Sequence, residues 1–224
     1  MRILYGAPGS VFVRKPRILL QEKGISFIAQ PVNPMLEVSD EFKAISPLKK
    51  IPVFKDSNYV VADSSAICAY IDMKYPSPSF YPKDPETLGQ VLWLEEYADT
   101  ALFQAIAPCY YQTVLVPLYC HRQPDQNAIN TAISQNLPPV ADYLEKKVIG
   151  KQYLVSDQFT IADVAVTSTF LNMYLAGFPL SESKWPHLTT YLDRHFQRES
   201  FSSCVEDVKV ELKKVNDMIS LTSE

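Results

Sequence analysis

The chain has 224 residues, of which 47% are hydrophobic and 21% charged, as in globular proteins and unlike disordered chains. Its 21 basic and 25 acidic residues give a formal charge of -4, and no long basic block is present to bind nucleic acid or an anionic membrane. The six glycines form no nucleotide-binding loop of the G-x-G-x-x-G or G-x-x-x-x-G-K type, which excludes kinase, P-loop and Rossmann functions.

The first third of the chain has the pattern of a small α/β domain. Short apolar runs bounded by Gly, Pro, Asp or Asn predict strands at 3–5, 27–29, 52–54 and 59–61. The stretches between them predict helices at 12–23, 41–45 and 64–75. The last two strands are separated by a short turn and should form an antiparallel hairpin. The order βαβαββα therefore predicts a mixed sheet flanked by helices.

A proline-rich segment then marks a domain boundary. Four prolines lie between positions 76 and 85, a composition that favours an extended linker. We predict a first domain at 1–76, a linker at 77–86 and a second domain at 87–224. Because apolar residues beyond the linker recur at helical spacing, the second domain is predicted to be all-α.

Two stretches of the second domain are distinctive. Residues 100–121 include no Asp, Glu, Lys or Arg, but Pro108 and Pro117 interrupt them, so we predict a buried, bent helix and no membrane span. Near the end of the chain, apolar residues spaced by three and four predict an amphipathic helix that packs onto the domain or, alternatively, forms an intermolecular seam. They are Val205, Val208, Leu212, Val215 and Ile219.

The four cysteines indicate a reduced, intracellular protein. They form no C-x-x-C motif and no metal-ligand spacing with the three histidines, so neither a disulfide framework nor a metal site is expected. Gly6 and Pro8 interrupt the N-terminal apolar run too early for a signal peptide. These features predict a cytoplasmic location.

Ser10 is the first candidate functional residue. It follows the first predicted strand and stands where a helix N-cap is expected, so its hydroxyl and the free N–H groups of the first turn would face one point. Such a point suits an anion, including a thiolate. The alternative is that Ser10 only caps its helix. Tyr5, on the first strand, is a rival source of a catalytic hydroxyl, although it is better explained as a strand residue facing inward.

Two further segments place polar groups at element ends. If the Ile51–Pro52 peptide is cis, the backbone of Ile51 faces outward and offers a donor and an acceptor to another peptide. Asp63 and Ser64 stand at the start of a helix, where they bind a ligand or simply act as caps.

The order and separation of four motifs resemble the glutathione transferase superfamily over nearly the whole chain. Residues 10–17, SVFVRKPR, are similar to a stretch found in bacterial members that use an active-site serine. Residues 46–53 (SPLKKIPV) and 63–67 (DSSAI) are similar to the glutathione-binding segments of the family. Residues 159–163 (FTIAD) are similar to its N-capping box, which we interpret as serving folding alone.

The resemblance implies an N-terminal thioredoxin-like domain and a role for each matched position. Ser10 would be the catalytic residue that stabilises the glutathione thiolate. The resemblance also implies that glutathione is a co-substrate, that no metal is needed, and that a small, mostly apolar electrophile lies between the domains of a homodimer. The implied substrate-binding residues are Phe12, Lys50, Ile51, Pro52, Asp63, Ser64, Tyr110 and Tyr111.

Three departures from the family pattern carry expectations of their own. Val11 replaces the usual proline after the active serine, and Lys49 replaces the usual glycine, which should reshape the glutathione loop. Pro16 falls inside the helix expected to begin at Ser10, where it would remove one backbone hydrogen bond at a cost of about 3 kcal/mol, unless the first turn is irregular or the regular helix starts only near Lys15. A non-catalytic binding protein similar to the stringent starvation proteins, or a glutathione-dependent isomerase or dehalogenase, remains the alternative function.

Overall fold

A small mixed sheet forms the centre of the N-terminal domain. The computed structural model describes residues 1–221, with their side chains except those of 211, 212 and 214–221. The strands are β1 (Arg2–Tyr5), β2 (Ile28–Gln30), β3 (Val53–Asp56) and β4 (Tyr59–Ala62), in the order β2-β1-β3-β4. β1 pairs parallel with β2, and β3 runs antiparallel to both β1 and β4. The predicted mixed sheet and its hairpin are confirmed.

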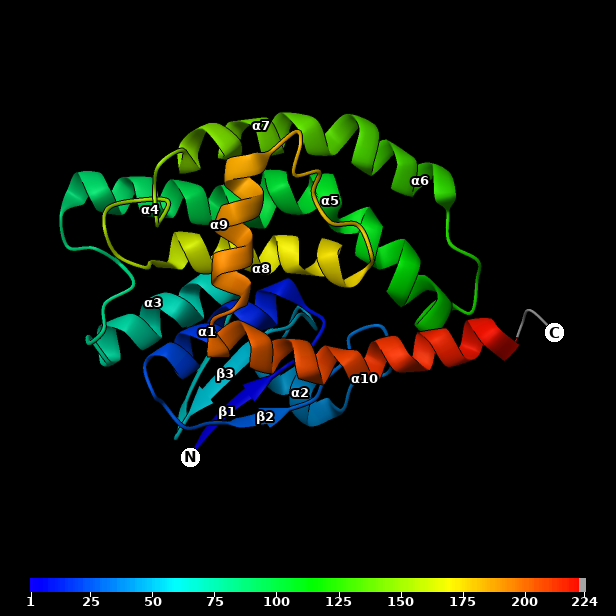
Figure 1. Ribbon diagram of the computed structural model, residues 1–224. Helices are drawn as coiled ribbons and strands as arrows, with labels where there is room; N and C mark the ends of the chain where they lie inside the picture. Colours follow the sequence, from blue (N-terminus) through cyan, green and yellow to red (C-terminus); the bar gives the residue numbers. More distant parts are fainter. Residues whose placement is uncertain (222–224) are drawn as a thin grey trace.

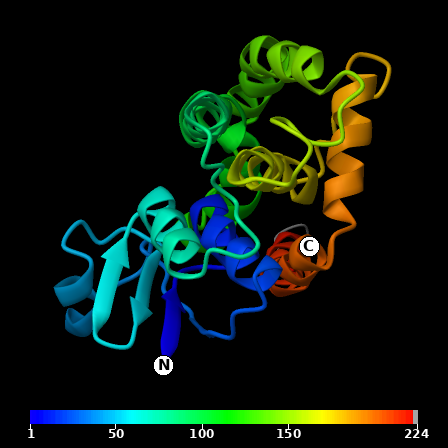
Figure 2. The ribbon, with the colours of Figure 1, turned by 90° about the vertical axis from the view of Figure 1, so that its left-hand side faces the viewer.

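Three helices complete this domain. They are α1 (Val11–Glu22), α2 (Asp40–Ile45) and α3 (Ser64–Lys74), so the predicted order βαβαββα and the thioredoxin-like fold class are confirmed. Leu4 and Phe54 of the sheet, Ile18 of α1 and Ile67 of α3 are buried in one apolar core. Because α1 packs against both α3 and a long helix of the second domain, it lies at the junction of the two domains (Figure 2).

The proline-rich connection has no regular secondary structure, but it is anchored. It runs from the end of α3 to the start of α4 (Pro85–Tyr97). The carboxylate of Asp72 accepts a hydrogen bond from the backbone N–H of Phe80 at 2.8 Å and pairs with the ammonium group of Lys23 at 2.7 Å. The Lys23 ammonium group also donates to the carbonyl of Tyr75. These bonds and the buried ring of Phe80 fasten the connection to the N-terminal domain.

The second domain begins with a long helical path. After α4 it continues through the π-helical segment η1 (Ala98–Leu102), α5 (Phe103–Tyr110) and the π-helical segment η2 (Tyr111–Cys120). Figure 1 shows this path turning downward beyond α5. A proline removes one helical hydrogen bond, and π-helical turns and bends occur where the regular ladder is interrupted. The bent helix predicted at 100–121 is therefore confirmed.

The remaining helices pack around a central one. α8 (Ile161–Leu175) is buried along almost its whole length, and the Thr160 and Asp163 capping box predicted at its start is present. The others are α6 (Gln126–Thr131), the π-helical η3 (Ala132–Asn136), α7 (Leu137–Val148), α9 (Pro186–Phe196) and α10 (Glu199–Leu221). The all-α class of the second domain is confirmed.

The last helix runs along the junction of the two domains. α10 packs against α1 and η2, and Val208 is buried there, as expected for a helix that covers its own domain. The side chains of Leu212, Val215 and Ile219, which continue the predicted stripe, lie outside those that the structure describes. Within residues 1–221, no helix is long and apolar enough to cross a membrane.

Candidate functional site

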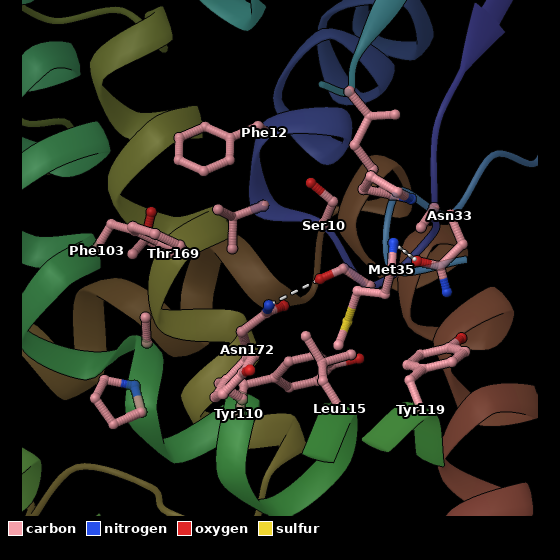
Figure 3. A pocket seen from close by; sticks show the side chains of 18 of the residues that line it. Ser10, Phe12, Asn33, Met35, Phe103, Tyr110, Leu115, Tyr119, Thr169 and Asn172 are labelled. Carbon is pink, nitrogen blue, oxygen red and sulfur yellow. Dashed lines mark hydrogen bonds between the residues drawn. The ribbon is translucent and has the colours of Figure 1, made fainter. Parts of the chain in front are cut away.

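A cavity of about 740 Å³ lies between the two domains (Figure 3). The turn before α1 and two loops of the N-terminal domain form one side of it, and α5, η2 and α8 form the other. Six of the nine predicted site residues line this cavity, namely Ser10, Phe12, Lys50, Ile51, Tyr110 and Tyr111. Residues separated by a hundred positions in the sequence therefore meet at one site.

Ser10 is the N-cap of α1, as predicted. Its backbone is extended, and its hydroxyl oxygen accepts a hydrogen bond from the N–H of Val13 at 3.4 Å. The hydroxyl proton remains available to donate, because a hydroxyl can donate and accept at once. The side chain projects into the cavity (Figure 3). A hydroxyl and the positive end of a helix dipole thus meet at one point of the cavity wall.

Pro16 lies inside α1 and does not displace the start of the helix. The helix is regular from Val11 onward, and the N–H of Arg14 donates to the carbonyl of Ser10 at 3.0 Å. The first-turn bonds come from residues that precede Pro16. Its missing N–H removes the bond that the carbonyl of Phe12, the second residue of α1, would otherwise accept. The structure therefore shows a regular helix that lacks one backbone bond, and neither an irregular first turn nor a start near Lys15.

The loop before β3 keeps a tight shape although it holds a lysine where the family pattern has glycine. Lys49 adopts a φ of 55°, the left-handed conformation that glycine adopts most easily. The Lys49 N–H donates to the carbonyl of Ser46 at 2.8 Å, and the Ser46 hydroxyl donates to the carbonyl of Lys50 at 2.7 Å. The Ile51–Pro52 peptide is cis, as predicted. The loop thereby brings Lys49, Lys50 and Ile51 to the cavity.

Pro52, Asp63 and Ser64 do not line the cavity itself. Pro52 and Ser64 are buried, whereas Asp63 is exposed and caps α3 by accepting hydrogen bonds from the N–H groups of Ser65 and Ala66. Because Val53 pairs with Ala62, the start of β3 and the end of β4 are neighbours at one end of the sheet. The carboxylate of Asp63 therefore lies at the sheet end that also carries the Ile51 loop.

Aromatic rings form much of the opposite wall. The centroids of the Phe12 and Phe103 rings are 4.9 Å apart, so these two side chains join the domains at the cavity edge. Tyr110 is buried and Tyr111 is 40% exposed, and both line the cavity. Tyr5, the alternative source of a catalytic hydroxyl, does not line the cavity. The centroid of its ring lies 6.2 Å from that of Phe42, a residue of α2.

The structure adds a residue that the sequence did not indicate. Asn172 of α8 lines the cavity, and its side-chain N–H₂ donates to the carbonyl of Gly9 at 2.8 Å (Figure 3). Its side-chain oxygen accepts from the buried guanidinium of Arg14 at 2.7 Å. Asn172 is one of several polar residues of α8, together with Thr167, Ser168 and Thr169, and no defined spacing relates it to the serine motif.

A buried ion cluster anchors α1 next to the cavity. The Lys15 ammonium group pairs with the carboxylates of Glu95 and Asp99 and donates to the hydroxyl of Ser65. Burial alone would lower the pKa of Lys15, but the two carboxylates outweigh it and raise that pKa. Lys15 therefore stays charged and links α1 to α3, α4 and η1.

Three of the four native thiols are buried. Cys68, Cys109 and Cys204 are buried, and burial raises the pKa of each, to about 11 for Cys109. Cys120 is half-buried. Within residues 1–221, no group of three or more His, Cys, Asp or Glu side chains has the arrangement of a metal site.

The chain is similar to known proteins over both domains. Residues 4–79 match the family model of the glutathione S-transferase N-terminal domain, and residues 106–199 match that of the C-terminal domain. Glutathione S-transferase theta-3 of Mus musculus is 25% identical over 90% of this chain and 84% of its own. A stringent starvation protein A homolog of Haemophilus ducreyi is 23% identical over 90% of this chain and 88% of its own. The crystal structure of a glutathione S-transferase from Rhodospirillum rubrum shares the fold, with a TM-score of 0.84 and 23% identity over 91% of each chain.

Proposed function

The chain belongs to the glutathione transferase superfamily. From that premise we propose that it binds glutathione in the interdomain cavity and joins the sulfur of glutathione to an electrophile. The observation that carries the proposal is the placement of the Ser10 hydroxyl at the N-terminus of α1, facing the cavity. A thiolate at that point accepts a hydrogen bond from the hydroxyl and lies at the positive end of the helix dipole. Both interactions favour the ionised thiol.

The loop at 49–51 and the start of α3 would hold the rest of the tripeptide. The Ile51 backbone is the expected partner of the cysteinyl peptide groups, and Lys50 that of the glycyl carboxylate. Asp63 and Ser64 are the expected partners of the γ-glutamyl end, since they lie at the same end of the sheet as this loop. Glutathione would then lie along the N-terminal domain with its sulfur beside Ser10.

The second substrate is proposed to be a small, uncharged, mostly apolar electrophile. The cavity-lining residues of the helical domain carry no Asp, Glu, Lys or Arg side chain, so they provide no counter-charge for an ionic substrate. Phe12, Phe103, Tyr110 and Tyr111 provide flat apolar surfaces. The thiolate attacks the electrophilic carbon, a sulfur–carbon bond forms, and the leaving group departs with the bonding electron pair. Catalysis comes from thiolate formation and from holding the reactants together.

We place the protein in the cytoplasm as a homodimer. Large apolar side chains are exposed on α3, α4 and β4, namely Met73, Leu92, Trp93 and Tyr59. Exposed apolar side chains of this size favour burial against a partner, here a second copy of the chain. Sedimentation measurements on the native protein test the dimer directly.

A non-catalytic binding protein is the second candidate. The similarity to the stringent starvation protein A homolog supports it, because that relative matches nearly the same share of the chain as the transferase does. The two candidates share one cavity and differ in whether the chain converts a substrate there, so turnover distinguishes them.

The experiment combines binding and activity on one sample. Calorimetric titration with glutathione should show one site per chain, and an activated aryl chloride should then be consumed with formation of the glutathione conjugate. Binding without conjugation of any electrophile in a panel that includes isomerase and dehalogenase substrates would favour the non-catalytic protein. Absence of glutathione binding would refute the transferase and would leave the non-catalytic protein as the remaining candidate.

A further inference from the structure

Helix α8 of the helical domain reaches the turn that presents Ser10. Asn172, which is 9% exposed, donates to the Gly9 carbonyl at 2.8 Å. One turn earlier in α8, the hydroxyl of Ser168 donates to the carbonyl of Val11 at 3.4 Å. Two hydrogen bonds from one helix thus reach the residues on either side of Ser10.

The orientation of the Asn172 amide is fixed by its partners. Arg14 can only donate, so its guanidinium must face the side-chain oxygen of Asn172, and this leaves the N–H₂ group toward Gly9. The same guanidinium donates to the carbonyl of Ser168 at 2.9 Å. Asparagine is suited to this position because it donates and accepts at once, which neither an aspartate nor an apolar side chain does.

We infer that Asn172 is a positioning residue for Ser10, and as a statement about catalysis this inference rests on the proposed function. The Gly9–Ser10 peptide is held on both sides, because its carbonyl accepts from Asn172 and its N–H donates to the carbonyl of Ala7 at 3.1 Å. Without Asn172 the carbonyl side of this peptide is no longer held, and only the bond to Ala7 restrains it. The hydroxyl of Ser10 is then held less well at the point where the sulfur lies.

The test measures the geometry at position 10 without glutathione. In a background of Ser10→Cys and Cys120→Ser, the introduced thiol is the reactive one, since the other cysteines are buried with raised pKa values. Its pKa is obtained from the rate of alkylation by iodoacetamide as a function of pH. It should lie below the ordinary value of about 8.5, because the thiol is at a helix N-terminus.

Adding Asn172→Ala should raise this pKa by roughly half a unit to one unit, as expected for losing one well-placed hydrogen bond. Thr167→Ala, a change at a fully buried polar residue of the same helix, serves as the matched control and should leave the pKa unchanged. Asn172→Leu, which fills the space, gives the same comparison if the alanine variant does not fold. Melting temperatures separate loss of folding from loss of position.

An introduced thiol with the same pKa in the presence and absence of Asn172 would overturn the inference. Equal shifts from Asn172→Ala and Thr167→Ala would also overturn it, because they would indicate general loosening of α8. Calorimetry with glutathione on the native chain tests the proposed function separately. The inference about position 10 therefore fails or stands independently of glutathione binding.

Discussion

The hydroxyl oxygen of Tyr191 lies 2.7 Å from Oδ1 of Asp163, a carboxylate oxygen at the start of the central helix α8. Oδ1 of Asp163 also accepts a hydrogen bond from the N–H of Leu154 at 2.8 Å, and Oδ2 of Asp163 accepts one from the N–H of Thr160 at 2.8 Å. Asp163 is fully buried. Asp163 therefore closes the capping box, and it also joins α8 to α9 through Tyr191 and to the loop before α8 through Leu154.

We predict that Asp163→Ala lowers the free energy of unfolding by about 2–4 kcal/mol, since it leaves several buried donors without an acceptor. The motif alone predicts about 1 kcal/mol, the usual value of a helix cap. Urea unfolding measures the difference, with Ser39→Ala, the loss of an exposed cap of α2, as the control at about 1 kcal/mol. Equal losses in both variants would show that the tertiary bonds contribute nothing. Glutathione affinity per folded molecule should not change.

Lys49→Gly should stabilise the protein by about 0.5–1 kcal/mol. At a φ of 55° a lysine carries a steric cost of about 1–2 kcal/mol that glycine lacks, and the greater flexibility of glycine in the unfolded chain offsets part of the gain. Lys50→Gly is the control and should destabilise or do nothing. A lower melting temperature for Lys49→Gly would mean that the lysine side chain makes contacts that outweigh its backbone cost.

The fold could be predicted from the sequence because its signals are local. Short apolar runs, the proline segment at 76–85 and the Thr160–Asp163 motif each determine nearby structure. The regular start of α1 could not be predicted in the same way. The proline rule correctly identifies the bond lost at the carbonyl of Phe12, but it does not show that the helix keeps its start at Val11 in spite of this loss.

His195 should make stability depend on pH. It is buried against the rings of Tyr191 and Phe159, and burial, reinforced by the positive charges of Arg198 and Arg194, lowers its pKa to about 4. In the unfolded chain its pKa is about 6.5, so the unfolded state binds a proton first as the pH falls. Stability is therefore complete above about pH 6.5 and declines between pH 6.5 and 4, by up to about 3 kcal/mol.

Replacing this histidine should remove that decline. Unfolding of His195→Phe by urea at a series of pH values should show a flatter profile than the native protein in this range. His187→Phe, at an exposed position, is the matched control and should keep the native profile. A native-like slope in His195→Phe would assign the pH dependence to other groups.

Phe103→Ala should weaken binding of the electrophile and spare glutathione. Its ring packs on Phe12 and lines the cavity from the helical domain, whereas the loop at 49–51 belongs to the N-terminal domain. We therefore expect roughly a tenfold rise in KM for an aryl electrophile. Steady-state kinetics and glutathione calorimetry separate the two effects. Tyr5→Phe, outside the cavity, should change neither quantity. If Tyr5→Phe lowered turnover more than Ser10→Ala does, the catalytic hydroxyl would be that of Tyr5 and not that of Ser10.

The site was predictable where a motif marks it and unpredictable where tertiary packing makes it. Ser10 and Ile51 lie in short motifs that can be recognised in the sequence without knowledge of the packing. Asn172 joins the site only because α8 packs against α1, and no linear spacing encodes that packing. The position of Asp63 at the sheet end that carries the Ile51 loop follows from the pairing of β3 with β4, which a motif does not describe.

Thiolate absorbance of bound glutathione, titrated against pH in the native protein and in Ser10→Ala, is the most direct test of the proposed mechanism. We predict a thiol pKa below its ordinary range in the native complex and a higher value in Ser10→Ala, with glutathione affinity largely kept. A charge-assisted hydrogen bond of about 1.5–3 kcal/mol corresponds to a roughly ten- to hundredfold loss of turnover at neutral pH, which should shrink as the pH rises. Identical titration curves for the two proteins would contradict the assignment of Ser10 as the residue that stabilises the thiolate.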